Sequence, residues 1–169
     1  GWQAGSVIPI ASALIDSNGC FRLNVPLPQE GFYLLGTEQG VMHPFYLKGN
    51  ETIRLRFQTN GMILEGEQTP ENQALSQWEQ AATLVREHAF LYERFGGGYS
   101  TDPATFTQEL EDLLRVRQQL KPEKATGNAT FNSLLKAKME ADVDFYALAY
   151  LQRNAGNLSD TIRLSNYYQ

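Results

Sequence analysis

The chain of 169 residues has few of the side chains that most often carry chemistry. It has one cysteine, Cys20, which excludes an internal disulfide, and two histidines, His43 and His88. A metal site needs three or four His, Cys or carboxylate ligands that converge, and these three residues fall in three different expected elements. Cys20 has no second cysteine for a C-x-x-C redox pair. The sequence therefore predicts no metal site and no cofactor, and it predicts a partly exposed, chemically ordinary thiol at Cys20.

Basic residues are also scarce. The 14 Lys and Arg stand against 19 Asp and Glu, for a formal net charge of -5. Phosphate binding needs clustered basic residues, and the densest basic group is interrupted by Glu123 and Glu140. We interpret this group as a solvated helix surface; its members are Lys121, Lys124, Lys136 and Lys138. No apolar run approaches the roughly 18 to 20 residues of a membrane span. We therefore expect no nucleic-acid partner and no membrane span in this chain.

Two further patterns are weak candidates for chemistry. The glycines of "FGGGYS", residues 95–100, leave one expected helix and precede another, with no nearby Lys, so they predict a helix connection rather than a phosphate loop. Two groups of acidic residues on helices could supply an acid–base pair. Both groups lie on the polar sides of amphipathic helices, where we expect solvated charge; they are Glu109, Glu111, Asp112, Glu140, Asp142 and Asp144. No catalytic residue is predicted.

Residues 1–67 have the pattern of a β-sheet. Side chains alternate between apolar and polar in "CFRLNV", residues 20–25, and in "ETIRLRF", residues 51–57. Such alternation is typical of strands with one buried face. Turn-forming residues recur at short intervals between the runs, for example at 17–19 and 60–61. Short strands between such turns indicate an antiparallel β-meander or a partial sandwich.

Residues 68–169 have the period of helices. Apolar residues at three-to-four spacing predict helices over about 70–95, 103–120 and 130–154. Thr69-Pro70 and Asp102-Pro103 are helix starts, since a side-chain oxygen caps free amides and proline suits the first helical position. Gly156 fits the end of the last helix. Strands followed by about three helices make an α+β chain, and we expect the helices to pack on the sheet as one domain.

Tyr33 and Tyr46 are the candidate ligand-binding residues. They are out of phase with Phe32 and Phe45, which predicts that the two tyrosines share the outer face of the sheet. Exposed tyrosines on a sheet can bind sugar or peptide. Packing under a helix is the favoured alternative, because three helices need a surface to cover.

Several motifs along the chain resemble one known domain. The stretch "ALIDSNGCFRLNVPLPQEGFYLL" is similar to the "ID-x-x-G-x-F" strand-turn-strand in the N-terminal domain of bacterial envelope thioredoxin-like proteins. The stretches "FYLKGNETIRLRF" and "EGEQTPENQALSQW" resemble the next strands of that domain and the start of its first helix. The matching residues are Asp16, Gly19, Phe21, Leu47, Gly49, Ile53, Gly66, Asn72 and Leu75.

The resemblance implies a role in cell redox homeostasis. In that family the domain precedes a thioredoxin-fold domain with a W-C-x-x-C pair, and the protein is an exported thiol-disulfide oxidoreductase, often a lipoprotein. This chain has no W-C-x-x-C, so no catalytic residue is carried over.

Since Gly1-Trp2 is not a natural start, we also expect a targeting segment to have been removed. The expected partners are the downstream thioredoxin-fold domain, another envelope protein or a second copy of this chain. The expected location is the periplasm or the cell surface. A free-standing glycan- or peptide-binding module of the cell envelope is the alternative.

Overall fold

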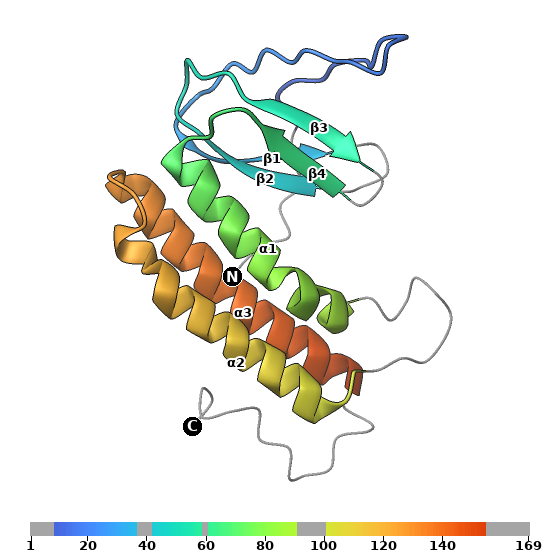
Figure 1. The fold of residues 1–169 in the computed structure, drawn as a ribbon, viewed down its shortest axis with the longest axis vertical. Helices are drawn as coiled ribbons and strands as arrows, with labels where there is room; N and C mark the ends of the chain where they lie inside the picture. The colour runs from blue at the N-terminus through green and yellow to red at the C-terminus, as the bar shows by residue number, and fades with distance from the viewer. Residues whose placement is uncertain (1–8, 37–41, 59–60, 91–100, 155–169) are drawn as a thin grey trace.

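The protein has two small β-sheets at one end of a three-helix bundle (Figure 1). The computed structural model describes residues 9–36, 42–58, 61–90 and 101–154. The order of strands first and helices second confirms the predicted α+β class.

Each sheet is one antiparallel pair of consecutive strands. Strand β1 (Gly31–Gly36) pairs with β2 (Met42–Leu47), and β3 (Arg54–Gln58) pairs with β4 (Gly61–Glu65). The β1–β2 pair lies against the helices, and β2 contacts the first of them.

The strand predicted over residues 20–25 is wrong. These residues have no ladder partner in the part of the chain that the structure describes, although their side chains do alternate between half-buried and exposed. Phe21 takes the inward position expected of it, with its ring centroid 6.1 Å from that of Phe57. The alternation of apolar and polar residues correctly predicted which side chains are more buried. It contained no information on whether a second strand lies within hydrogen-bonding distance.

The helices begin where the capping residues predicted. Helix α1 (Pro70–Phe90) follows Thr69, whose Oγ1 accepts the backbone N–H of Asn72 at 3.2 Å. Helix α2 (Pro103–Leu120) follows Asp102, whose side chain accepts the backbone N–H groups of Ala104 and Thr105. Helix α3 (Ala129–Asn154) also matches its predicted range. The expected end of the first helix beyond residue 90, the glycines at 96–98 and Gly156 lie outside the described residues.

The connection from α2 to α3 lies within the described residues. Lys121 ends α2 with a φ of 46°, and the short 3-10 helix η2 (Pro122–Lys124) leads toward α3. Helices α1 and α3 run in the same direction and α2 runs against them (Figure 1). The core between them is made of fully buried side chains from all three helices, which include Trp78, Ala82, Val85, Phe106, Leu110, Leu113, Leu135, Met139, Val143 and Tyr150.

Candidate functional site

Tyr33 and Tyr46 do not share a face of the sheet, so that expectation is wrong. The β1–β2 register pairs Tyr33 with Phe45 and Phe32 with Tyr46. Because residues directly opposite in an antiparallel pair point to the same side, Tyr33 lies on one face of the sheet and Tyr46 on the other. The sequence pattern gave the alternation within each strand, but only the register relates the phase of one strand to that of its neighbour.

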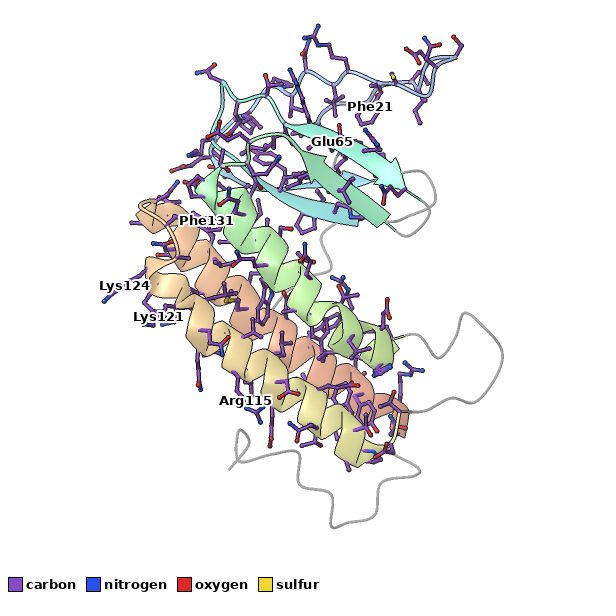
Figure 2. The ribbon with its side chains drawn as sticks, viewed as in Figure 1. Phe21, Glu65, Arg115, Lys121, Lys124 and Phe131 are labelled. Atoms are coloured by element: carbon purple, nitrogen blue, oxygen red, sulfur yellow. The ribbon has the colours of Figure 1, made fainter. Side chains whose placement is uncertain are left out.

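Tyr46 lies in the contact between the sheet and the helices. Its side chain is 1% exposed, and its ring meets those of Phe32 and Phe131 edge-on, with centroids 5.7 and 4.9 Å away. Figure 2 places Phe131 at the end of the bundle next to the sheets. The hydroxyl of Tyr46 donates to Glu30 Oε2 at 3.1 Å. Burial, with a smaller effect of Glu30, raises the pKa of Tyr46 to about 12. Tyr46 therefore packs under the helices, as the alternative interpretation expected.

Tyr33 has a different environment. It is half-buried, and its hydroxyl donates to the backbone oxygen of Gln29 at 2.6 Å. The ring stands on the sheet face that points away from the bundle, and its polar end is already bonded to the chain. Of the two predicted binding residues, Tyr33 is the more exposed.

Asn72 joins the first turn of α1 to strand β2. Its Oδ1 accepts the backbone N–H of Tyr46 and its Nδ2 donates to the carbonyl oxygen of Tyr46, both at 2.9 Å. The side chain is 2% exposed. A side-chain amide has one donor and one acceptor side, like a peptide group, so Asn72 takes the place that a neighbouring strand would take beside Tyr46.

A network of charged residues joins α1 to α3. Lys138 Nζ lies 2.9 Å from Glu79 Oε1 and 2.8 Å from Asp142 Oδ2. Glu79 Oε2 accepts a hydrogen bond from Arg86 at 2.8 Å, and Asp142 Oδ2 accepts the indole N–H of Trp78 at 2.8 Å. The prediction that Lys138 and Asp142 are solvated surface charges is therefore wrong, since both side chains are largely buried.

The pKa shifts in this network favour the charged forms of Glu79 and Lys138. Burial would raise the pKa of Glu79, but Lys138 and Arg86 outweigh burial and hold that pKa below its usual value. Burial would likewise lower the pKa of Lys138, but Glu79 and Asp142 outweigh it and raise that pKa. Burial and then Asp142 raise the pKa of the neighbouring Tyr146 to about 12. Because every shift favours the form already present at neutral pH, the network is suited to holding two helices together rather than to transferring protons.

Signals of this network were present in the sequence. Lys138 and Asp142 are spaced i,i+4, which brings opposite charges together on a helix. Met139, which lies between them on the same turn, belongs to the buried core of the bundle. What the sequence did not contain was the approach of Glu79 from α1, because that contact depends on how two distant helices pack.

Of the other acidic candidates, four are also paired and Asp144 is exposed; the four are Glu109, Glu111, Asp112 and Glu140. His88 Nδ1 lies 2.7 Å from Glu109 Oε2, which joins α1 to α2. Glu140 Oε1 lies 3.5 Å from Arg117 Nη2, and Asp112 forms an ion pair with Arg115.

The two remaining candidates are His43 and Cys20. The ring of His43 is 5.8 Å from that of Phe57, and burial, with a smaller effect of Arg86, lowers the pKa of His43. Cys20 is exposed, more fully than the partial exposure predicted for it. No group of three or more His, Cys, Asp or Glu with metal-binding geometry occurs among the described residues.

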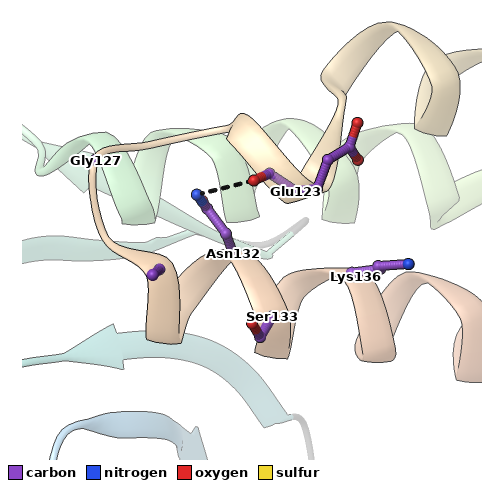
Figure 3. Close-up of a pocket in the computed structure, with 6 residues that line it drawn as sticks. Glu123, Gly127, Asn132, Ser133 and Lys136 are labelled. Carbon is purple, nitrogen blue, oxygen red and sulfur yellow. Dashed lines mark hydrogen bonds between the residues drawn. The ribbon is translucent and has the colours of Figure 1, made fainter.

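A pocket of about 360 Å³ lies between η2 and the start of α3 (Figure 3). Asn132 is the buried polar side chain in its wall. Asn132 Nδ2 donates to the backbone oxygens of Thr126, at 2.9 Å, and of Glu123, at 3.4 Å, while Oδ1 accepts the backbone N–H of Thr126 at 3.0 Å. These bonds close the connection from α2 to α3, so Asn132 has a structural role here. The remaining lining residues are Glu123, Gly127, Ala129, Ser133 and Lys136.

No helix of the described segments is long and apolar enough to cross a membrane. Comparison with protein-family models, with curated proteins and with solved structures finds no match to this chain.

Proposed function

We propose that this chain is a non-catalytic accessory domain of an exported thioredoxin-like thiol-disulfide oxidoreductase. In this role it positions a downstream redox domain or selects that domain's partners, in the periplasm or at the cell surface, with a lipid anchor as the expected attachment. The observation that carries the proposal is the ordered series of motif residues from Asp16 to Leu75. Seven of these nine residues have a local structural task, as expected for a shared domain rather than a shared catalytic site.

The first motif forms a tight turn. Asp16 Oδ1 accepts the backbone N–H groups of Asn18, at 2.8 Å, and Cys20, at 2.9 Å. Gly19 has a φ of 76°, a conformation that side chains disfavour. Phe21 then packs on Phe57. Asp, Gly and Phe at this spacing are what such a turn requires, which supports a structural origin of the "ID-x-x-G-x-F" pattern.

The residues of the later motifs lie at two more sharp turns and at the contact between the sheet and the helices. Gly49 has a φ of 98° and Gly66 has a φ of 75°. Asn72 binds both backbone groups of Tyr46, and Leu75 is almost fully buried one turn later in α1. A domain with this arrangement needs these residues for its fold, so their presence supports a relationship of architecture and implies no chemistry in this chain.

The polar groups of the described segments support the non-catalytic part of the proposal. Glu109 is engaged in an ion pair with His88 and Glu79 in an ion pair with Lys138, and both pairs join two helices. In a redox protein of this kind the electrons pass through the paired thiols of the thioredoxin-fold domain. The accessory domain formed by this chain contributes surface.

The proposal is tested on the native polypeptide by removing residues 1–169 and assaying disulfide reduction. We expect unchanged reduction of a small disulfide and an altered rate or choice among protein disulfides, because only large partners reach the accessory domain. Equal loss of both activities would assign this segment to the catalytic unit. No change in either activity would remove the partner-selecting role.

A second candidate is a glycan- or peptide-binding module, favoured by the partial exposure of Tyr33. Binding to a glycan and peptide panel, lost in Tyr33→Ala and kept in Tyr46→Phe, supports this candidate. The matched control works because Tyr46→Phe keeps the buried ring and removes only its hydroxyl. A panel without binders rejects it.

A further inference from the structure

The turn between Asp16 and Cys20 contains an asparagine followed by a glycine. Asn18 is exposed, and its side-chain amide makes no hydrogen bond in the part of the chain that the structure describes. Gly19 follows it, with open space where a Cβ would stand. Since glycine has no side chain to shield its backbone nitrogen, this nitrogen can approach the side-chain carbonyl carbon of the asparagine. Asn18 therefore has the surroundings in which an asparagine amide reacts with its own main chain.

We propose that Asn18 is a site of spontaneous deamidation, with aspartate and isoaspartate as the products. The backbone nitrogen of Gly19 bonds to Cγ of Asn18 and loses its proton, while the bond from Cγ to Nδ2 breaks and Nδ2 leaves as ammonia. Water then opens the cyclic imide that has formed. Opening at Cγ gives aspartate, and opening at the main-chain carbonyl carbon of residue 18 gives isoaspartate. The reaction needs water and no other reactant.

The hydrogen bonds of the turn limit the rate of this reaction. The N–H of Gly19 donates to the backbone oxygen of Asp16 at 3.0 Å, so this bond must open before the nitrogen can attack. Asp16 Oδ1 also accepts the N–H groups of Asn18 and Cys20. The whole turn is exposed, and short stretches of surface backbone open at low free-energy cost. Asn18 is therefore expected to react more slowly than in an unfolded peptide, yet faster than an exposed asparagine without a following glycine.

Both products disturb the turn. Each replaces a neutral amide by a carboxylate two residues from the carboxylate of Asp16, and like charges this close repel one another. Isoaspartate also carries the main chain through its side-chain carbon atoms, which lengthens the backbone by one atom. The N–H groups of Gly19 and Cys20 then no longer match the acceptors of Asp16. We expect a looser turn and weaker packing of Phe21 on Phe57.

Asn50 is the matched control within the same chain. It is also exposed and has a φ of 60° beside Gly49, but it is followed by Glu51, whose side chain shields the backbone nitrogen. Trypsin separates the two sites, because residues 1–22 and 49–54 form separate fragments that contain one asparagine each. Asn60, which also precedes a glycine, lies outside the described residues and falls in a third fragment, residues 57–86.

Uptake of heavy oxygen from water tests the proposal. The native protein is incubated in water labelled with heavy oxygen and is then digested in ordinary water, so that only conversion in the native state takes up the label. Fragment 1–22 is expected to take up the label at least about tenfold faster than fragment 49–54, a difference of about 1.4 kcal/mol in activation free energy. Asn18→Gln should abolish uptake in fragment 1–22, because glutamine has to form a larger ring. No uptake in fragment 1–22 of the parent, equal uptake in both fragments, or uptake in fragment 1–22 of Asn18→Gln would overturn the proposal.

Discussion

The helical bundle and the two sheets differ in how each is stabilised. Three helices of the bundle enclose a shared core, in which side chains such as Trp78, Leu110 and Met139 are fully buried. Each sheet is a single pair of strands, and an isolated pair is marginally stable in water. The β1–β2 pair gains its stability from the bundle through Tyr46, Phe131 and Asn72. The bundle therefore acts as the scaffold, and the sheets depend on it.

The largest expected effect comes from the core of the bundle. Trp78→Ala should lower the free energy of unfolding by about 3 to 5 kcal/mol, since it leaves a cavity and removes the bond to Asp142. Phe57→Ala in β3 should cost much less, because that ring is already 36% exposed. Denaturant unfolding followed by circular dichroism measures both. Equal costs would break the distinction between scaffold and dependent sheets.

The next effect lies at the contact between the two regions. Asn72→Leu leaves the buried N–H and carbonyl of Tyr46 without their partner, and each such group costs about 1 to 3 kcal/mol. Gln77→Leu, at an exposed position of the same helix, is the matched control and should be nearly neutral. Hydrogen exchange should show faster exchange in β2 of the Asn72 variant while α2 stays protected. An equal change of the exchange rates in β2 and α2 would contradict the dependence of the sheet on this contact.

The charge network gives an intermediate, pH-dependent effect. The folded state lowers the pKa of Glu79 from its ordinary 4.5, so its contribution to stability is full above that ordinary value and is lost as the pH falls through the lowered one. Glu79→Gln should cost about 1 to 3 kcal/mol at neutral pH, because Lys138 and Arg86 lose their shared partner.

Melting at a series of pH values measures this dependence. The difference between the parent and Glu79→Gln should shrink in acid, in the range below pH 4.5. A difference that stays constant through that range would show that Glu79 contributes packing rather than charge.

A smaller effect is expected at the Asp16–Cys20 turn. Gly19→Val forces a side chain into a positive φ of 76°, at a cost of about 1 to 2 kcal/mol. Gly127→Val is the control, since Gly127 has equally open surroundings and no positive φ. Thermal melts compare the two variants. A Gly19 variant with the melting temperature of the parent would contradict the claim that the positive φ strains a side chain at this turn.

The smallest effect concerns Cys20. The thiol is exposed, so a disulfide reagent should modify it in the native state at the rate of an unstructured peptide thiol, without change in the melting temperature. A far faster reaction would indicate an activated thiol and reopen a redox role for this chain.

The helical half was the more predictable of the two regions. Caps such as Thr69 and Asp102 act within one turn of the helix, so local sequence contained the information for them. The sheet half depended on register and on partner strands. For that reason the faces of Tyr33 and Tyr46, and the state of residues 20–25, were predicted wrongly although the alternation itself was correct.

The candidate sites were also predictable where they depend on neighbours in sequence and not predictable where they depend on distant residues. The environments of Cys20 and of the Asp16 turn were predictable from neighbours in sequence. The Glu79–Lys138 pair and the Asn72–Tyr46 bonds connect residues far apart in the chain, and no local pattern specifies such contacts.

The measurement that tests the functional proposal most directly is peptide mapping of the native polypeptide by mass spectrometry, with attention to residues that follow Gln169. The proposal predicts a downstream segment that contains W-C-x-x-C in the same polypeptide. A native chain that ends near Gln169, without such a segment, would contradict the proposal and leave the binding module as the function to pursue.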